Sequence, residues 1–328
     1  MKTTPRIKPQ LRLLPALLLA ALPALANADD NQPLQQVEVS ASLIPLGVAD
    51  SANQGTVTAK QLENRPLLRT GELLEAVPGL IVTQHAGDGK ANQYFARGFN
   101  LDHGTDFRTT VMGMPVNLPT NAHGQGYSDL NFVIPELIST IQYKKGTYYA
   151  EEGDFSAAGA AAFDYVRQLE QGLLSVEAGQ HRFHRALVAN ATPLAGGTLL
   201  YALERAGQDG PWDTPEDYKR TNGVLSYSWS RGDDDVRVTA MGMHSSWNST
   251  DQVPQRALDA GLIGRYGALD PSDGGETSRY SLSGDWTRQY ADGASRVKRV
   301  RHQVAPGPVQ QFYVCAGRPR PRRPVPTV

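Results

Sequence analysis

The most constraining feature of the sequence is a series of strand-like segments separated alternately by short turns and long polar connections. Gly196-Gly197 and Arg231-Gly232-Asp233 are short joints, whereas residues 207–221 and 247–277 are long. Short turns that alternate with long loops are typical of transmembrane β-barrels. The expected strands are 160–169, 172–180, 182–192, 197–206, 222–231, 235–246 and 278–290.

Side-chain polarity in these segments alternates with a period of two. Residues 225–230 alternate Leu, Tyr and Trp with serine, and Tyr280, Leu282 and Trp286 share one face of the last segment. This period predicts strands with one apolar and one polar face. A soluble β-sandwich would show the same alternation, so both architectures stay open at this point.

The N-terminus has the composition of a secretory signal. Cations between Lys2 and Arg12 precede the apolar run LLPALLLAALPAL, and the small-residue site Ala26-Asn27-Ala28 follows. The run is shorter than the roughly 20 apolar residues that span a membrane. We therefore expect residues 1–28 to be a cleaved signal peptide, and export favours the barrel.

Residues 29–165 follow a mixed pattern of short helices and strands. GTVTAKQLEN predicts a strand that enters a helical turn, and residues 70–77 predict a helix that ends at Pro78-Gly79. QYFARGF and TTVMGMPV are strand candidates, the second broken at Met112-Gly113. Residues 133–143 predict a second helix, with Pro135 in its first turn.

Four segments in this region, taken in order, resemble the plug domain of TonB-dependent outer-membrane receptors, over roughly residues 35–165. Met112 stands where the family usually has Asp, and Gly146-Thr147 replaces Gly-Pro, which indicates a divergent branch. The segments are LLEAVPGLIV (Leu73–Val82), YFARGFN (Tyr94–Asn100), VMGMPVN (Val111–Asn117) and the stretch Pro135–Phe163.

The resemblance implies an α+β globular plug domain followed by antiparallel transmembrane β-barrel strands, the front of a 22-stranded barrel. It implies an outer-membrane receptor of Gram-negative bacteria that takes up a scarce ligand, such as an iron-siderophore or another metal chelate. The expected domains are a signal peptide (1–28), an energy-coupling segment (29–50), the plug (51–165), barrel strands (166–295) and an aberrant basic tail (296–328).

Receptors of this family are energised by a TonB-type inner-membrane protein that captures a segment near the mature N-terminus by strand addition. The candidate segment here is QQVEVSA, with Gln36, Val37, Glu38, Val39 and Ser40 as the expected contacts. An exported linker or a first plug strand is the alternative. Outer-membrane lipid is a further expected partner, whereas nucleic acid and a cofactor are not expected.

Asp102, His103, His123 and Tyr127 lie in polar plug loops where the family's substrate-facing apices fall. Histidine with aspartate could ligate a metal or contact a metal chelate. Solvated or hydrogen-bonded loop histidines are the alternative. No catalytic constellation is present in the sequence, so an enzyme is not expected. The sequence leaves iron siderophore, haem, cobalamin, another metal and carbohydrate open as the ligand.

The sequence after Tyr290 changes character. Asp292-Gly293 is a hairpin signal, yet no second strand is expected, because the chain becomes basic and proline-rich. Residues 296–328 contain eight Lys or Arg and no Asp or Glu. We expect a lost reading frame near residues 294–298 and a chain that does not transport; an authentic basic arm is the alternative. A secreted, periplasmic plug-like binding protein without a barrel is the second function considered.

Overall fold

The computed structural model of the chain describes residues 51–84, 87–121, 123–249 and 252–306. The predicted signal peptide, the TonB-box candidates Gln36–Ser40 and residues beyond 306 lie outside this part. The described residues form three sheets, of five, three and seven strands. None of the helices described is both long enough and apolar enough to cross a membrane.

The five-stranded sheet has the order β1-β7-β8-β5-β6. β5 and β8 pair in parallel, and the other neighbours are antiparallel. The strand and helical turn predicted for GTVTAKQLEN form as β1 and α2 (Ala59–Leu62). The strands are β1 (Gln54–Thr58), β5 (Phe107–Val111), β6 (Met114–Pro115), β7 (Ile138–Lys145) and β8 (Gly159–Tyr165).

The small sheet joins β2 (Leu80–Thr83), β3 (Gln93–Ala96) and β4 (Phe99–Asn100). The helix expected at residues 70–77 forms as a 3-10 helix, η2 (Thr70–Ala76), and not as an α-helix. The N–H of Val77 donates to the carbonyl three residues earlier at 3.0 Å, which is the tighter 3-10 pattern.

The prediction of a helix at residues 133–143 was wrong. Pro135–Leu137 makes one 3-10 turn, η3, and Ile138 begins strand β7. A bulge between Ile138 and Thr140 shifts the phase of this strand, so that Ile138 and Ile141 are both buried. The bulge therefore gives a strand the apolar spacing of a helix.

These two sheets and η2 enclose an apolar core, which we call the plug core. Leu73 of η2, Ile141 of β7 and Phe163 of β8 are all completely buried in it. Another 3-10 turn, η4 (Ala150–Glu152), lies between β7 and β8. The domain packs as an ordinary water-soluble protein does, with its large apolar side chains inside.

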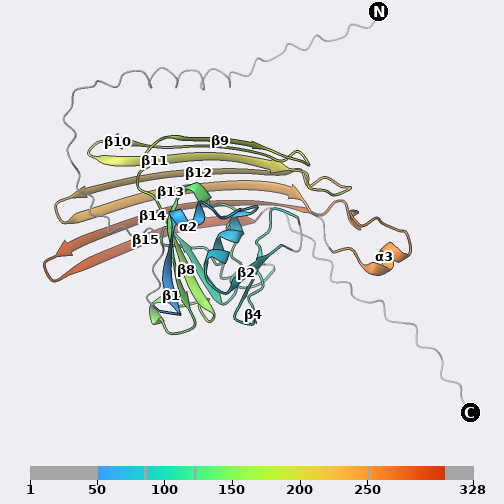
Figure 1. Cartoon of the computed structure of the whole chain (residues 1–328), viewed down its shortest axis with the longest axis horizontal. Helices are drawn as coiled ribbons and strands as arrows, with labels where there is room; N and C mark the ends of the chain where they lie inside the picture. The colour runs from blue at the N-terminus through green and yellow to red at the C-terminus, as the bar shows by residue number, and fades with distance from the viewer. Residues whose placement is uncertain (1–50, 85–86, 122, 250–251, 307–328) are drawn as a thin grey trace, which may run out of the picture. The chain divides into compact units, whose positions relative to one another are not determined.

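The seven-stranded sheet is antiparallel, and each strand pairs with its neighbours in the sequence (Figure 1). Within the described residues this sheet is open, with β9 and β15 as its edges. Its strands are β9 (Leu173–Ala178), β10 (His184–Leu194), β11 (Gly197–Gln208), β12 (Tyr218–Arg231), β13 (Asp234–Asn248), β14 (Gly274–Tyr290) and β15 (Gly293–Pro306).

Two expectations about this sheet were wrong. The segment at 160–169 was counted with the repeated strands, but β8 pairs with β7 and β5 in the plug. A strand does follow Asp292-Gly293: β15 pairs with β14 from Tyr290–Gly293 to Thr277–Pro306. The two-residue turn sets the register, and backbone pairing then proceeds regardless of side-chain charge.

The faces of this sheet have opposite polarity. Side chains of the inner face are buried although many are polar, including Glu204, Asn222, Ser226, Ser228, Arg237, Thr239, Arg279, Ser281 and Ser283. Side chains of the outer face are exposed although they are apolar, including Leu174, Val176, Val188, Leu203, Leu225, Val238, Tyr280 and Leu282. A soluble sandwich would bury the apolar face, so this arrangement distinguishes the two architectures that the alternation left open.

The two ends of the sheet also differ. Residues 195–196, 232–233 and 291–292 are tight turns at one end, which we call the short-turn end. Residues 209–217 and 249–273 are long connections at the other end, the long-loop end, and the second contains α3 (Gln255–Asp259).

Candidate functional site

The first part of the candidate site is the turn after β4, which carries Asp102 and His103. Leu101 is fully buried, and its N–H donates to the carbonyl of Tyr94 in β3 at 2.9 Å. The N–H of Asp102 donates to Asn100 Oδ1 at 2.9 Å. Asp102 has φ of +47°, a left-handed conformation that Asp adopts more readily than most residues. The backbone under both side chains is therefore fixed by the β3–β4 hairpin.

His123 and Tyr127 come from a second loop, which a backbone bond from the Leu118 N–H to the Tyr127 carbonyl closes at 2.9 Å. The N–H of Ser128 donates to the carbonyl of His103 at 2.7 Å. This bond ties the second loop to the first and brings the two histidines together.

Asp102, His103 and His123 form what we call the histidine cluster. Oδ1 of Asp102 lies 3.4 Å from Nε2 of His123 and 3.7 Å from Nε2 of His103. The two imidazole rings meet edge to face, with centroids 4.1 Å apart. One potential ligand atom from each residue lies within 4.8 Å of the others. A set of two imidazoles and one carboxylate can hold a transition metal.

The backbone of a single residue, Ala91, supports the cluster from behind. Nδ1 of the buried His103 lies 2.8 Å from the carbonyl oxygen of Ala91, and the Tyr127 hydroxyl accepts the Ala91 N–H at 2.8 Å. The Tyr127 ring lies 5.7 Å from the His103 ring and 6.3 Å from the His123 ring. Burial raises the pKa of Tyr127 well above its ordinary value, so its hydroxyl stays neutral.

The four residues predicted as separate loop positions thus lie in one place. The structure brings together all of Asp102, His103, His123 and Tyr127. Their role as ligand contacts stays a prediction.

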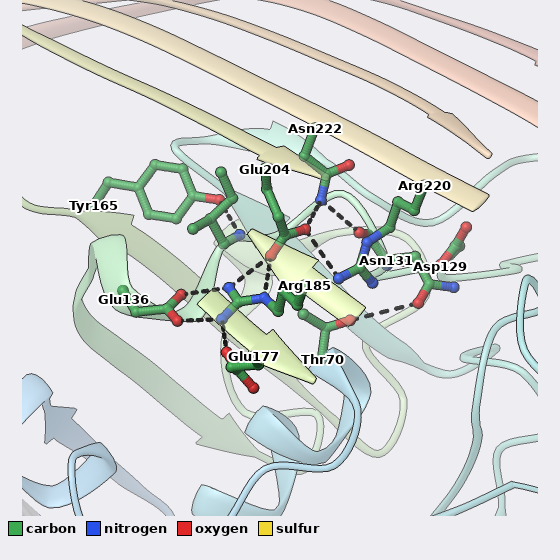
Figure 2. A network of polar contacts seen from close by, with 11 residues as sticks. Thr70, Asp129, Asn131, Glu136, Tyr165, Glu177, Arg185, Glu204, Arg220 and Asn222 are labelled. Carbon is green, nitrogen blue, oxygen red and sulfur yellow. Dashed lines mark hydrogen bonds and ion pairs between the residues drawn. The ribbon is translucent and has the colours of Figure 1, made fainter. Parts of the chain in front are cut away.

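A second set of residues holds the plug against the inner face of the sheet, and we call it the Glu204 network (Figure 2). Glu204 on β11 has no exposed surface. Its carboxylate lies 2.6 Å from Arg185 on β10 and 2.9 Å from Arg220 on β12, and it accepts a bond of 3.0 Å from Asn222.

The network crosses from the sheet to the plug at two points. Arg185 donates two bonds, of 2.6 and 2.9 Å, to the carboxylate of Glu136 in η3. Asn222 donates to the carbonyl of Asn131 at 2.9 Å. A bidentate arginine–carboxylate pair fixes the relative orientation of both partners as well as pairing their charges.

Other inner-face arginines donate to plug carbonyls. Arg237 on β13 reaches the carbonyls of Tyr165 and Val166 at 3.0 and 2.8 Å. Arg279 on β14 reaches the carbonyl of Pro115 at 2.7 Å, and its guanidinium lies 4.7 Å from the Phe132 ring centre. The plug is therefore held by directed polar bonds along most of the inner face.

At the long-loop end, the plug segment 87–91 approaches the sheet, and its residue Asp88 contacts the connection between β11 and β12. The N–H of Asp88 donates to Glu216 Oε1 at 3.1 Å, and Gln208 donates to the Asp88 carboxylate. Burial raises the pKa of both carboxyl groups, and the neighbouring Asp88 raises that of Glu216 further. Gly89 lies so close to the Trp247 ring that any side chain there would overlap it. Since Ala91 belongs to the same segment, the histidine cluster lies toward the long-loop end.

The Glu204 network and the Asp88–Glu216 contact were not predicted from the sequence. One signal was present: Glu204, Arg220 and Asn222 all occupy the polar phase of their strands, where a soluble sheet has apolar residues. Glu136 and Arg185 are 49 positions apart, and their pairing requires the register of the folded sheet.

This architecture is similar to that of known outer-membrane receptors. The sequence model of the TonB-dependent receptor plug domain matches residues 48–160. The solved structure of the ferric citrate transporter FecA in its unliganded form has a TM-score of 0.65 with this chain at 15% identity. That match covers 79% of this chain and 41% of FecA.

Two receptors of Pseudomonas aeruginosa show the same fold. FpvA bound to pyoverdine has a TM-score of 0.57 at 14% identity, over 77% of this chain and 34% of FpvA. The ferric enterobactin receptor PfeA has a TM-score of 0.57 at 15% identity, over 78% of this chain and 42% of PfeA. The chain thus spans well under half the length of each of these receptors.

Proposed function

Because the chain carries the plug domain of TonB-dependent receptors and, after it, strands with the fold of their barrel, we propose that it belongs to an outer-membrane receptor for active uptake of a scarce metal chelate. An iron-siderophore is the chelate favoured by the comparisons, since the similar receptors are described with ferric citrate, ferric enterobactin and pyoverdine.

The observation that carries the proposal is the polarity of the seven-stranded sheet. Leu225 and Leu282 at the outer face are each more than half exposed, whereas Ser226 and Thr239 at the inner face are buried. Exposed apolar surface of this extent is unfavourable in water and favourable in lipid. Alternation of apolar-out and polar-in residues is the pattern of strands in an outer membrane.

The plug contacts support a role in admission of the ligand. A 22-stranded barrel is too wide for its own side chains to fill, so a folded domain must obstruct it. The Glu204 network holds the plug to the inner face by ion pairs and hydrogen bonds. Such polar contacts break and re-form more readily than an interdigitated apolar core, which suits a domain that must rearrange.

Energy for that rearrangement would come from a TonB-type inner-membrane partner. Gln36–Ser40 are the proposed contacts, by strand addition at the candidate segment QQVEVSA. The histidine cluster would face the ligand, since the long-loop end of a barrel is its extracellular end. By itself this chain is expected not to transport, because the open edges of β9 and β15 would expose unpaired backbone groups in lipid.

Tryptophan fluorescence tests the proposal, because the four tryptophans occupy different surroundings. Trp229 and Trp286 lie on the outer face, Trp247 is buried on the inner face, and Trp212 lies in a long connection. Four variants, each retaining one tryptophan and having Phe at the other three positions, would be reconstituted in micelles of a brominated detergent.

We expect strong bromine quenching for the proteins that retain Trp229 or Trp286, and weak quenching for the one that retains Trp247. Equal, weak quenching of all four, with the chain recovered in the soluble periplasmic fraction, would overturn the proposal. That result would favour the periplasmic plug-like binding protein instead.

A further inference from the structure

The histidine cluster presents its three donors to one point. One ring nitrogen of His103, one ring nitrogen of His123 and one Asp102 carboxylate oxygen all lie within 4.8 Å of one another. Ligand atoms of a tetrahedral zinc site are separated by about 3.3 Å, given bond lengths of roughly 2.0–2.1 Å. The Asp102–His123 separation of 3.4 Å already meets this value, and that of 3.7 Å to His103 nearly does.

The buried histidine is oriented as a metal ligand requires. The Ala91 carbonyl can only accept, so Nδ1 of His103 carries the hydrogen of their 2.8 Å bond, and Nε2 of the neutral ring keeps its lone pair. Metal-binding histidines usually donate their second N–H to a carbonyl or carboxylate in this way, which fixes tautomer and ring direction.

The three residues differ in freedom. His103 is only 4% exposed, whereas His123 is 24% and Asp102 47% exposed at the side chain. One rigid ligand therefore faces two that can adjust, and solvent reaches the cluster from the Asp102 side. An entering cation would meet an open coordination position there.

We propose that Asp102, His103 and His123 bind a divalent transition-metal cation of the zinc type directly. Imidazole suits zinc, copper and nickel, whereas harder cations such as magnesium and calcium prefer all-oxygen sites. A ferric ion enclosed by the oxygens of a chelator has no coordination position left for these side chains. The cation is thus a second ligand class, bare or weakly chelated, and its role as cargo rests on the proposed function.

Zinc binding by the full chain, purified without a histidine tag in detergent, tests the inference. We expect one Zn²⁺ per chain by equilibrium competition with a chromophoric chelator. Co²⁺ at the same site should give the visible absorption of a four-coordinate ion, which zinc then abolishes. His123→Ala and Asp102→Asn should each weaken Zn²⁺ binding at least about tenfold, since loss of even a supporting partner costs 10–100-fold.

A matched control removes a histidine outside the cluster. His181 is exposed at the long-loop end and has φ of +54°, which Asn tolerates, so His181→Asn should leave zinc affinity unchanged. Because His103 is buried and its loss threatens folding, the two more exposed positions carry the test, with circular dichroism confirming their fold.

No stoichiometric zinc binding by the folded chain, or equal affinity in His123→Ala, Asp102→Asn and His181→Asn, would overturn the inference. The failures of the two proposals are distinguishable. Zinc binding without bromine quenching of Trp229 would support the metal site and contradict the receptor proposal. Quenching without zinc binding would support the receptor proposal and contradict the metal site.

Discussion

The plug and the seven-stranded sheet bury opposite kinds of side chain. Leu73 and Phe163 are fully buried in the plug core, whereas the sheet buries Arg237 and Ser226 and exposes Leu225. Under the proposed function the two regions follow the same rule in different surroundings, because the apolar face of the sheet contacts lipid and the plug core excludes water. Whether burial of a side chain stabilises a region therefore depends on the medium that surrounds that region.

β15 differs from the other six strands of the sheet, because its backbone continues the hydrogen-bonded ladder while its side chains do not continue the polarity pattern. Its backbone continues the sheet, yet its register puts Arg301 opposite Leu282 and Arg299 opposite Gly284 on the outer face. Val300 lies opposite Ser283 on the inner face. Lys298 and His302 share that inner face, so the two faces of β15 do not differ in polarity as those of the first six strands do. Arg in the middle of the proposed lipid-facing band is costly.

The largest effect is expected at the Glu204 network. Glu204→Ala removes the carboxylate that pairs with the guanidinium groups of Arg185 and Arg220. Loss of this partner should lower the unfolding free energy by about 3–5 kcal/mol. Urea unfolding of the chain in detergent would measure it. Glu170→Ala at an exposed position is the control, with an expected effect within about 0.5 kcal/mol. Equal effects of both substitutions would mean that the network does not hold the plug.

The plug core should respond next. Leu137→Ala removes a completely buried side chain and should cost about 2–5 kcal/mol. The same urea titration measures it, and its size should be the same in detergent and in detergent-free buffer wherever the plug is folded. A loss that depends on detergent would contradict the view that this region packs as a water-soluble protein.

A charge on the outer face should cost slightly less, and only in lipid. Leu225→Arg in the middle of β12 should weaken folding into lipid vesicles by about 2–4 kcal/mol, whereas Thr221→Arg, nearer the long-loop end, should cost about 0–1 kcal/mol. The fraction of chain that becomes protease-resistant with vesicles measures both. An equal cost at both positions would mean that the outer face does not enter lipid.

The smallest effect concerns pH at the Asp88–Glu216 contact. Burial raises the pKa of Glu216, so the folded chain keeps a proton that the unfolded chain releases above about pH 4.3. The contribution of Glu216 to the unfolding free energy therefore falls as the pH rises from about 4.3 through the raised pKa of the folded chain. An amide side chain at this position carries no titrating proton and has no such loss.

Glu216→Gln should thus gain stability relative to the natural protein between pH 4 and pH 8, compared by unfolding midpoints at both values and at pH 6. Glu170→Gln, at an exposed position, is the control. A difference that stays constant with pH would mean that Glu216 titrates as an exposed carboxyl group does.

The sequence predicted much of the sheet and part of the site. β10 to β14 lie within a few residues of their expected positions, because period-two alternation directly reports two unlike faces. The sequence prediction was wrong at β7, where a bulge gives a strand the apolar spacing of a helix. It was also wrong at β15, where the basic sequence argued against a strand that the preceding turn supports.

The site was predicted as residues and not as an arrangement. Asp102, His103, His123 and Tyr127 were recognisable by chemistry and loop position, but nothing local shows that the backbone of Ala91 contacts both His103 and Tyr127. The Glu204 network depends on pairing between distant segments, which only the register and the docking of the plug determine.

The number of strands in the sheet has a topological consequence. β9 starts at the short-turn end, and six reversals later β15 finishes at the long-loop end, with Pro306 opposite Thr277. The two edge strands therefore point the same way. Joining them to each other would create a parallel seam in an otherwise antiparallel sheet, and an all-antiparallel closure needs an odd number of additional crossings between β15 and β9. Parity alone, independent of any side chain, thus sets how these seven strands can be continued.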